Sequence, residues 1–161
     1  MIQYDVKAYH ASDSGTGVDY RTRVKGVTVT SATVSARNMA IADPASKLSG
    51  TWSRSGTLVT VTITDNGLSN GDRVFLDVAP GTTMRDGVYP VSNVTQNTFT
   101  VTSVTSGTAN GTADIYTNIY LELDTYNTIG LPVEIPGEGI LCENGFFAGV
   151  GANVTATIFY G

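Results

Sequence analysis

The residues of this sequence best suited to chemistry are three glutamates close together, Glu134, Glu138 and Glu143. Two carboxyl groups about 5–10 Å apart perform glycoside hydrolysis in many enzymes. The segment offers no second paired acid and no aromatic platform for a sugar ring, and Pro136 and Gly137 interrupt it. We therefore expect a solvated loop or a subunit contact here, and no catalytic residue.

A second group of oxygen donors lies in the middle of the chain, in Asp65-Asn66-Gly67, Asn70-Gly71-Asp72 and Asp77. Carboxylate and amide oxygens are the ligands that Ca²⁺ prefers, but the spacing does not match an EF-hand loop. Asx-Gly pairs are also what tight turns require. We therefore expect turns at the Asx-Gly segments and no metal site.

The sequence holds one histidine, His10, and one cysteine, Cys142. A transition-metal site needs several such ligands, and a Ser–His–Asp triad on a hydrolase fold usually brings a nucleophile-elbow motif, which is missing here. Cys142 follows Ile140 and Leu141, so we expect a buried thiol that behaves as a small apolar side chain. We expect no enzyme and no cofactor.

The composition narrows the class of partner. Only 14% of the residues are charged, against roughly 25% in typical soluble domains. The net charge is −5 and the nine basic residues are scattered, which disfavours nucleic-acid binding. No stretch approaches the ~20 apolar residues of a membrane span, and residues 1–20 contain no signal-like apolar run. The lack of a cystine framework is typical of folding in a cytoplasm.

Alternating apolar and polar residues predict strands over Arg23–Thr30, Leu58–Thr64 and Thr98–Thr102, because side chains on a strand point to alternate faces. We also expect a strand over Ile2–His10. Residues 31–42 contain the best helix formers with poor apolar spacing, and predict at most one helical turn.

The elements group into two units. We interpret residues 1–48 and 114–161 as the two halves of one host β-sandwich, and residues 49–113 as a small β-module inserted into it. Small residues mark both junctions, which is where insertions are tolerated. The alternative is one continuous sandwich. Within the module we expect strands over Arg73–Val78, 88–94 and 98–104, with a loop through Gly81 after the first of them and with Pro90 marking an edge or a bulge.

The predicted fold class is therefore all-β: an antiparallel, jelly-roll-like β-sandwich with an inserted small β-barrel or sandwich module. Exposed edge strands are a liability in such a fold, and a repetitive assembly covers them with neighbouring copies. We expect a homo-oligomer with closed symmetry, for which a trimer is one solution.

Residues 58–102 carry a characteristic series of short stretches, namely Gly67-Leu68-Ser69-Asn70-Gly71-Asp72, Val74-Phe75-Leu76-Asp77, Asp86-Gly87-Val88-Tyr89-Pro90-Val91 and Thr98-Phe99-Thr100-Val101. This resembles a small β-module of tail and other virion proteins of tailed phages, including marine and cyanobacterial ones. The stretches 135–146 and 154–161, with Arg23-Val24-Lys25-Gly26-Val27, are similar to small phage structural proteins.

The resemblance covers roughly half of the chain and implies a virion component assembled in the host cytoplasm. The leading hypothesis is a capsid decoration (cement) protein that binds the major capsid protein and stabilises the head. One alternative is a tail, fibre or adaptor component that binds other virion proteins. A second alternative is a carbohydrate-binding β-sandwich, for which an exposed row of aromatic side chains is expected.

Aromatic side chains are the candidates for the interface with such partners, because they are enriched in protein–protein contacts. Phe159 and Tyr160 are adjacent, so we expect one to enter the core and the other to meet a partner. We expect Trp52 to anchor the module on its host. The full set of interface candidates is Trp52, Tyr116, Tyr120, Tyr126, Phe146, Phe147, Phe159 and Tyr160.

Overall fold

The chain folds into three antiparallel β-sheets, so the predicted all-β class is confirmed. The computed structural model describes residues 6–32, 37–78, 84–126 and 129–161. Ile2 to Asp5 of the expected first strand, and the expected loop through Gly81, lie outside these residues. In the described part the helical structure is the single 3₁₀ turn η1 (Pro44–Ser46). No helix there is long and apolar enough to span a membrane.

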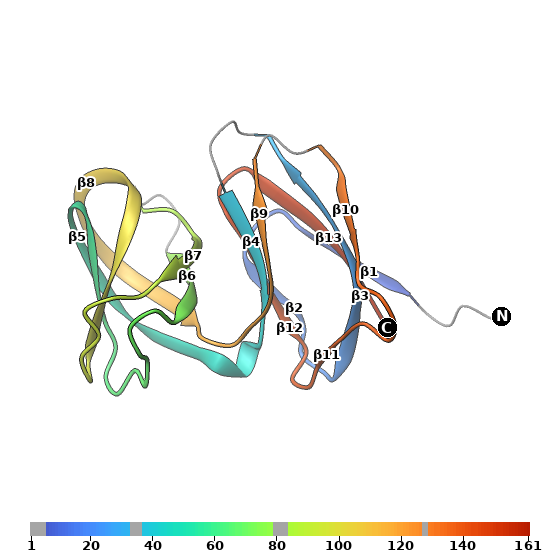
Figure 1. Cartoon of the computed structure of the whole chain (residues 1–161), viewed down its shortest axis with the longest axis horizontal. Helices are drawn as coiled ribbons and strands as arrows, with labels where there is room; N and C mark the ends of the chain where they lie inside the picture. The colour runs from blue at the N-terminus through green and yellow to red at the C-terminus, as the bar shows by residue number, and fades with distance from the viewer. Residues whose placement is uncertain (1–5, 33–36, 79–83, 127–128) are drawn as a thin grey trace.

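Two of the sheets form a sandwich with the strand order of a jelly roll (Figure 1). The first sheet, sheet A, has the order β1-β13-β3-β10, with the short β11 also paired to β3. The second, sheet B, has the order β2-β12-β4-β9. The strands are β1 (Lys7–Ala11), β2 (Gly15–Val18), β3 (Thr22–Ser31), β4 (Arg37–Ala42), β9 (Ile119–Thr125), β10 (Leu131–Glu134), β11 (Ile140–Cys142), β12 (Phe146–Val150) and β13 (Val154–Tyr160).

Strand β3 shows how the sequence sets this packing. Val24, Val27 and Val29 are all buried, although Val24 and Val27 are three residues apart and would face opposite sides of a regular strand. The pairing with β13 shifts by one residue at this place, between Phe159 and Tyr160. The resulting bulge returns all three valines to the core between the sheets.

The third sheet, sheet C, has the order β5-β8-β6-β7 and is folded into a small barrel (Figure 1). Its strands are β5 (Lys47–Thr62), β6 (Arg73–Val78), β7 (Gly87–Pro90) and β8 (Thr98–Tyr116). The long β5–β8 ribbon bends where Gly56 pairs with Gly107 and Leu58 pairs with Thr102. Gly56 has φ +67°, a left-handed conformation that glycine adopts readily. A Cβ on Gly50 would collide with the Thr62 carbonyl, so the ribbon closes back on itself.

The barrel has its own core, which contains Trp52, Leu76, Phe99 and Ile115. Trp52 is 2% exposed and its Nε1 donates a hydrogen bond of 3.2 Å to the Thr112 carbonyl within the same barrel. The expectation that Trp52 anchors the module on its host is therefore wrong: the indole fills the barrel.

Strand β4 corrects a second expectation, because residues 37–42 form a strand where we expected at most a helical turn; residues 33–36 lie outside the described part. Pro90 ends β7, which is an edge strand of sheet C, as predicted. Sheet C begins at Lys47 and ends at Tyr116, which pair with each other. Whether residues 49–113 are an independent folding unit stays a prediction.

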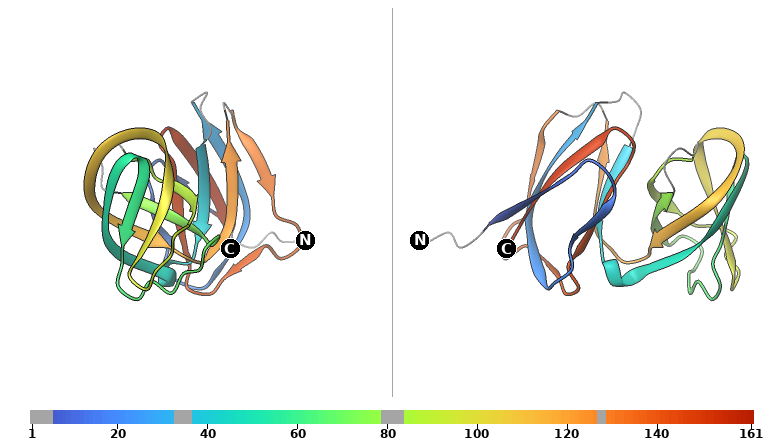
Figure 2. Two further views of the ribbon diagram at one scale, coloured as in Figure 1. Left: turned by 60° about the vertical axis from the view of Figure 1, so that its left-hand side comes forward. Right: turned by 180° about the vertical axis from the view of Figure 1, so that it is seen from behind.

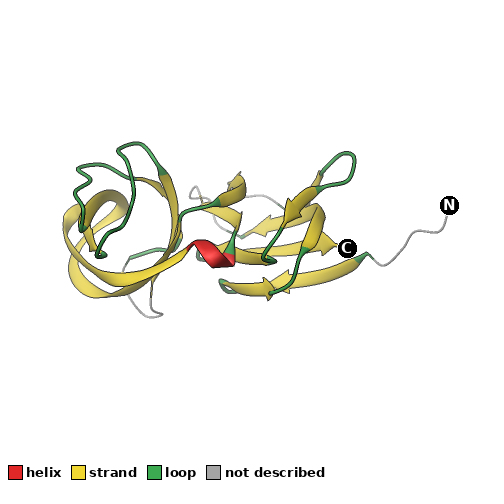
Figure 3. Ribbon diagram, turned by 90° about the horizontal axis from the view of Figure 1, so that it is seen from below, coloured by secondary structure: helices red, strands yellow, loops and turns green. Residues whose placement is uncertain are grey.

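The three sheets stack as layers. Sheet A and sheet B enclose the sandwich core, and the barrel covers the outer face of sheet B (Figures 1 and 2). The turn η1 lies between the barrel and the sandwich (Figure 3). The outer face of sheet A points away from the barrel (Figure 1).

Candidate functional site

The junction between the barrel and sheet B is formed by aromatic side chains from both bodies. Phe147 of β12 stacks on Tyr116 of β8, with ring centroids 3.7 Å apart and planes inclined by 15°. Phe75 of β6 meets the same phenylalanine edge-on at 5.7 Å. Together with Ala40, Ala42 and Val88 these rings form a separate buried cluster. Burial of this cluster fixes the barrel on the sandwich.

Glycines allow the two bodies to approach closely. A Cβ on Gly149 of β12 would lie 2.5 Å from the Phe75 ring, and a Cβ on Gly87 of β7 would lie 2.8 Å from Oδ1 of Asn38. Both distances are too short for a real contact. The side chains at these positions must therefore be absent for the junction to form.

Polar contacts fix the orientation of the junction. The Asn38 side chain of β4 pairs with the backbone of Val88: the Val88 N–H donates to Oδ1 at 3.0 Å, and Nδ2 donates to the Val88 carbonyl at 3.3 Å. Arg73 of the barrel donates from Nε to Glu122 of β9 at 2.8 Å and from a terminal nitrogen to the other carboxylate oxygen. Such a bidentate pair is directional.

A buried carboxylate organises the crossing from sandwich to barrel. Asp43 is 9% exposed and caps η1 by accepting a hydrogen bond from Ala45 N at 2.9 Å. Asn118 and Asn144 also donate to its carboxylate, at 3.3 and 3.2 Å. Burial and the neighbouring Asp43 raise the pKa of Tyr120 to about 12. This network joins three segments and supplies the hydrogen bonds that a buried carboxylate requires.

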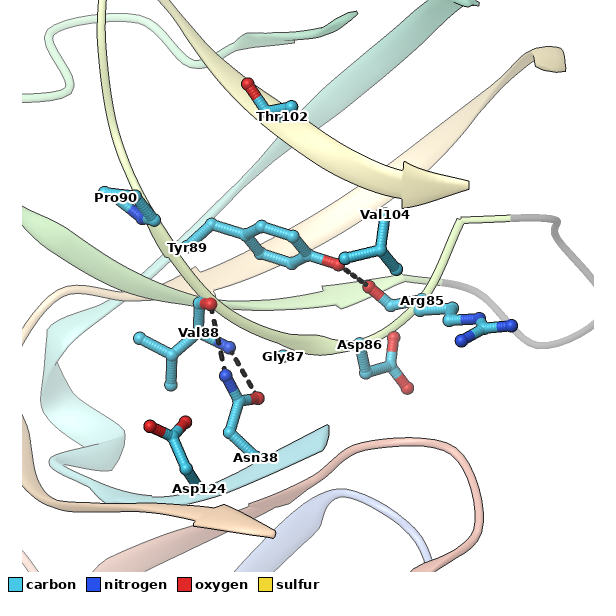
Figure 4. A pocket seen from close by; sticks show the side chains of 10 residues that line it. All are labelled: Asn38, Arg85, Asp86, Gly87, Val88, Tyr89, Pro90, Thr102, Val104 and Asp124. Carbon is cyan, nitrogen blue, oxygen red and sulfur yellow. Dashed lines mark hydrogen bonds between the residues drawn. The ribbon is translucent and has the colours of Figure 1, made fainter. Parts of the chain in front are cut away.

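A cavity of about 260 Å³ opens beside the junction (Figure 4). Its wall includes the Tyr89 ring, whose hydroxyl donates to the Arg85 carbonyl at 2.8 Å. The Asn38 side chain lies below Val88 in Figure 4, and both ends of its amide are hydrogen-bonded to the Val88 backbone. The cavity is lined by Asn38, Arg85, Asp86, Gly87, Val88, Tyr89, Pro90, Thr102, Val104 and Asp124. We call it the junction pocket.

Asp86 is the most perturbed carboxyl group of the junction pocket. Burial, with smaller contributions from the charges of Asp77 and Asp13, raises its pKa to about 6, against a usual value of 3.8. The Val78 N–H donates to Oδ1 at 2.8 Å and partly opposes this rise. A carboxyl group with a pKa near 6 can serve as an acid or base. Metal binding is a separate question: in the described residues no cluster of three His, Cys, Asp or Glu side chains is arranged to hold a metal.

A pair of aspartates lies nearby on the barrel, where Asp77 of β6 is directly opposite Asp114 of β8. Burial and the Asp114 charge raise the pKa of Asp77. Burial also acts on Asp114, but hydrogen bonds from Lys47 and Ser49 lower its pKa overall. The Lys47 ammonium lies 2.6 Å from this carboxylate. Opposed like charges cost stability, and the lysine offsets part of that cost.

The three glutamates Glu134, Glu138 and Glu143 lie at the surface near β10 and β11. Glu143 accepts from Arg21 Nε at 2.8 Å, and Glu138 lies 3.4 Å from Arg23. Both glutamate side chains are more than half exposed. Two of the three carboxylates are thus held in surface ion pairs.

The Asx-Gly segments form turns. Asn66 is buried, donates to the carbonyls of Thr95 and Gln96, and accepts from Leu68 N at 3.0 Å. Asp72 accepts from Ser69 N at 2.8 Å. These hydrogen bonds are the turn chemistry that the sequence predicts.

The structure separates the eight interface candidates by exposure. Trp52, Tyr116, Phe146 and Phe147 are buried within the chain, and two of them form the internal junction. Tyr120 and Tyr160 are partly buried and pack on the sandwich core. Phe159 pairs with Ala8 of β1 on one side and with Gly26 of β3 on the other. Tyr126 is 65% exposed. The candidates that reach the surface are Tyr120, Tyr126, Phe159 and Tyr160.

Sequence reasoning missed three residues of the junction. Asn38 and Arg73 bond to residues 50 and 49 positions away along the chain, and Asp86 is perturbed mainly by its burial, so their types and spacing give no local signal. It also passed over Tyr20, whose ring is 48% exposed beside the basic residues Arg21, Arg23 and Lys25. The clustering of an aromatic residue with basic residues is a signal that the sequence does contain.

No family model and no curated protein matches the sequence. Among solved structures, the chain has a partial similarity to a phage phi92 endosialidase, at 21% sequence identity and a TM-score of 0.35. The alignment covers 81% of this chain and 20% of that protein, so the chain spans one fifth of its length. A similarity at this level carries no argument about function.

Proposed function

We propose that this protein is a structural component of a tailed-phage virion and that it acts as a capsid decoration protein. The observation that carries the proposal is the fixed junction: Phe147 stacks between the two bodies, and Arg73 pairs with Glu122 across them. This rigid arrangement leaves the outer face of sheet A pointing away from the barrel (Figure 1). The sequence resemblance to small phage structural proteins supports the same conclusion.

The mechanism is passive. The outer face of sheet A, with Phe159 on it, docks on the major capsid protein, and the barrel faces outward. A ligand that binds the assembled shell and not the dissociated subunits stabilises the shell by mass action. Such a role requires a rigid body with complementary surfaces, and it uses no catalytic residue.

Separation of virion heads from tails tests this proposal. We expect the protein to copurify with heads, and we expect heads stripped of it to regain thermal stability when purified protein is added back. Recovery with the tail fraction would replace the proposal by the tail, fibre or adaptor alternative. Absence from both fractions would reject a virion role. The carbohydrate-binding alternative has lost its main candidate, because Trp52 is buried.

A further inference from the structure

A groove on sheet A, the sheet that lies away from the barrel in Figure 1, is lined by basic and tyrosine side chains. It encloses about 360 Å³ and lies where β1, β3, β11 and β13 end or begin. We call it the basic groove. The lining residues used below are Lys7, Tyr20, Arg21, Arg23, Leu141 and Tyr160.

The charge of the basic groove is opposite to that of the protein. The whole chain carries a net charge of −5, yet four of its nine basic residues are Lys7, Arg21, Arg23 and Lys25. Three of these line the groove, and Lys25 donates to the Glu138 carbonyl beside it at 2.7 Å. An acidic partner is therefore repelled by the protein as a whole and attracted at this place, which orients its approach.

The cationic groups have donors to offer. Arg21 uses Nε for Glu143, and the structure records no hydrogen bond from its terminal nitrogens to any described residue. The Lys7 ammonium lies 5.9 Å from the centre of the Tyr20 ring, and no described carboxylate is within ion-pair distance of it. The Arg21–Glu143 pair is exposed on both sides, and exposed pairs are weak and exchangeable.

The two arginines of the groove already pair with carboxylates of the chain itself. Arg21 and Arg23 hold the carboxylates of Glu143 and Glu138, two peptide side chains on either side of β11. Arginine and tyrosine are the residues most enriched at the centres of protein–protein interfaces. Tyr20 is half exposed, and it lines the groove together with Tyr160. Both the bound chemistry and the residue types favour a polypeptide.

We propose that the basic groove binds an acidic peptide segment of a partner protein, with Lys7, Arg21 and Arg23 holding its carboxylates and Tyr20 contacting its backbone or side chains. The inference rests on the proposed function for the origin of the partner, because a virion subunit meets other subunits. The chemistry of the groove does not depend on that assignment.

The test is fluorescence anisotropy with a labelled peptide of alternating glutamate and serine, compared with the same peptide carrying glutamine in place of glutamate. We expect the glutamate peptide to bind, to be released by added salt, and to bind about two- to fivefold more weakly to Arg21→Gln and to Lys7→Gln, because each variant removes one exposed ion pair. Lys47→Gln is the matched control, since it removes one positive charge far from the groove. Circular dichroism verifies that all three variants are folded.

Equal binding of the glutamate and glutamine peptides would overturn the proposal, and so would unchanged affinity in an Arg21→Gln, Lys7→Gln double variant. Competition identifies the class of ligand. The proposal would also be overturned if an acidic oligosaccharide or single-stranded DNA displaced the labelled peptide more strongly than an unlabelled peptide of equal charge does. The titration needs no virion, so its failure is distinguishable from failure of the head-copurification experiment.

Discussion

Replacement of Asp86 by asparagine should stabilise the protein above pH 6 and leave it unchanged near pH 4. Burial raises the pKa of this carboxyl group from 3.8 to about 6, so the folded state favours the neutral form. The favourable contribution of the protonated group is fully present below pH 3.8 and is lost as the pH rises through about 6. Asparagine keeps an Oδ1 that accepts from Val78 N and carries no charge at any pH.

The magnitude follows from the size of the shift. A difference of roughly two pKa units at about 1.4 kcal/mol per unit sets a ceiling of about 3 kcal/mol. Asp86 is half-buried, and solvent screening brings the expected gain to about 1–2 kcal/mol at pH 8. For a chain of this size the gain corresponds to a rise in Tm of about 2–4 °C per kcal/mol.

Urea unfolding of the wild type and Asp86→Asn between pH 4 and pH 8 measures this difference. Asp124→Asn is the matched control, because it removes an exposed carboxylate at the same pocket. The reasoning is refuted if the gain in unfolding free energy is as large at pH 4 as at pH 8, or if Asp86→Asn is less stable than the wild type at pH 8.

Three further predictions concern the junction and the thiol. Phe147→Ala should cost about 3–5 kcal/mol and split calorimetric unfolding into two transitions, whereas Phe159→Ala on the open face should retain one; a single transition in Phe147→Ala would contradict the role of the ring stack. Asn38→Ala should cost about 1–3 kcal/mol in urea unfolding, because it leaves the Val88 N–H and carbonyl unpaired; a loss below that range would show that water replaces the side chain. Burial raises the pKa of Cys142 to about 11, so a disulfide reagent should leave the folded protein unlabelled at pH 8 and react only in urea. Fast labelling without urea would argue against the buried thiol.

The sequence was most informative where one face of a strand is buried and the other is exposed to solvent. Alternation predicted the strands around Val27 and Phe99, and the Asx-Gly pairs predicted the turns between β5 and β6. A jelly-roll-like sandwich was predicted, and the observed strand order is that of a jelly roll. These features depend on local patterns, which a sequence displays directly.

Strand β4 shows why other elements were missed. Met39 and Ile41 face the sandwich core, while Ala40 and Ala42 face the barrel. A strand buried on both faces has no alternation to detect, so residues 37–42 gave no strand signal. The first half of β5 was not predicted for the opposite reason. Its segment Ser-Gly-Thr-Trp-Ser-Arg has few apolar residues, and its pairing with β8 holds it in a strand.

The site depended even more on distant pairs. Trp52 was expected at the boundary between the two units, but the bend at Gly56 folds the β5–β8 ribbon over the indole and encloses it. Phe147 and Tyr116 were expected to meet a partner protein, but the structure buries both rings at the junction inside the chain. Residue type indicated that these rings would meet a surface, and only the fold could show which one.

The pairing of Lys47 with Tyr116 has a mechanical consequence. The polypeptide enters and leaves the barrel at one point, beside η1, so tension carried along the sandwich strands passes from β4 to β9 without crossing the barrel. Stretching the sandwich would therefore put tension on the hydrogen bonds between β4 and β9 and none on the strands of the barrel. If the protein decorates a capsid as proposed, expansion of the shell would strain the two sheets of the sandwich, and the barrel would keep its shape.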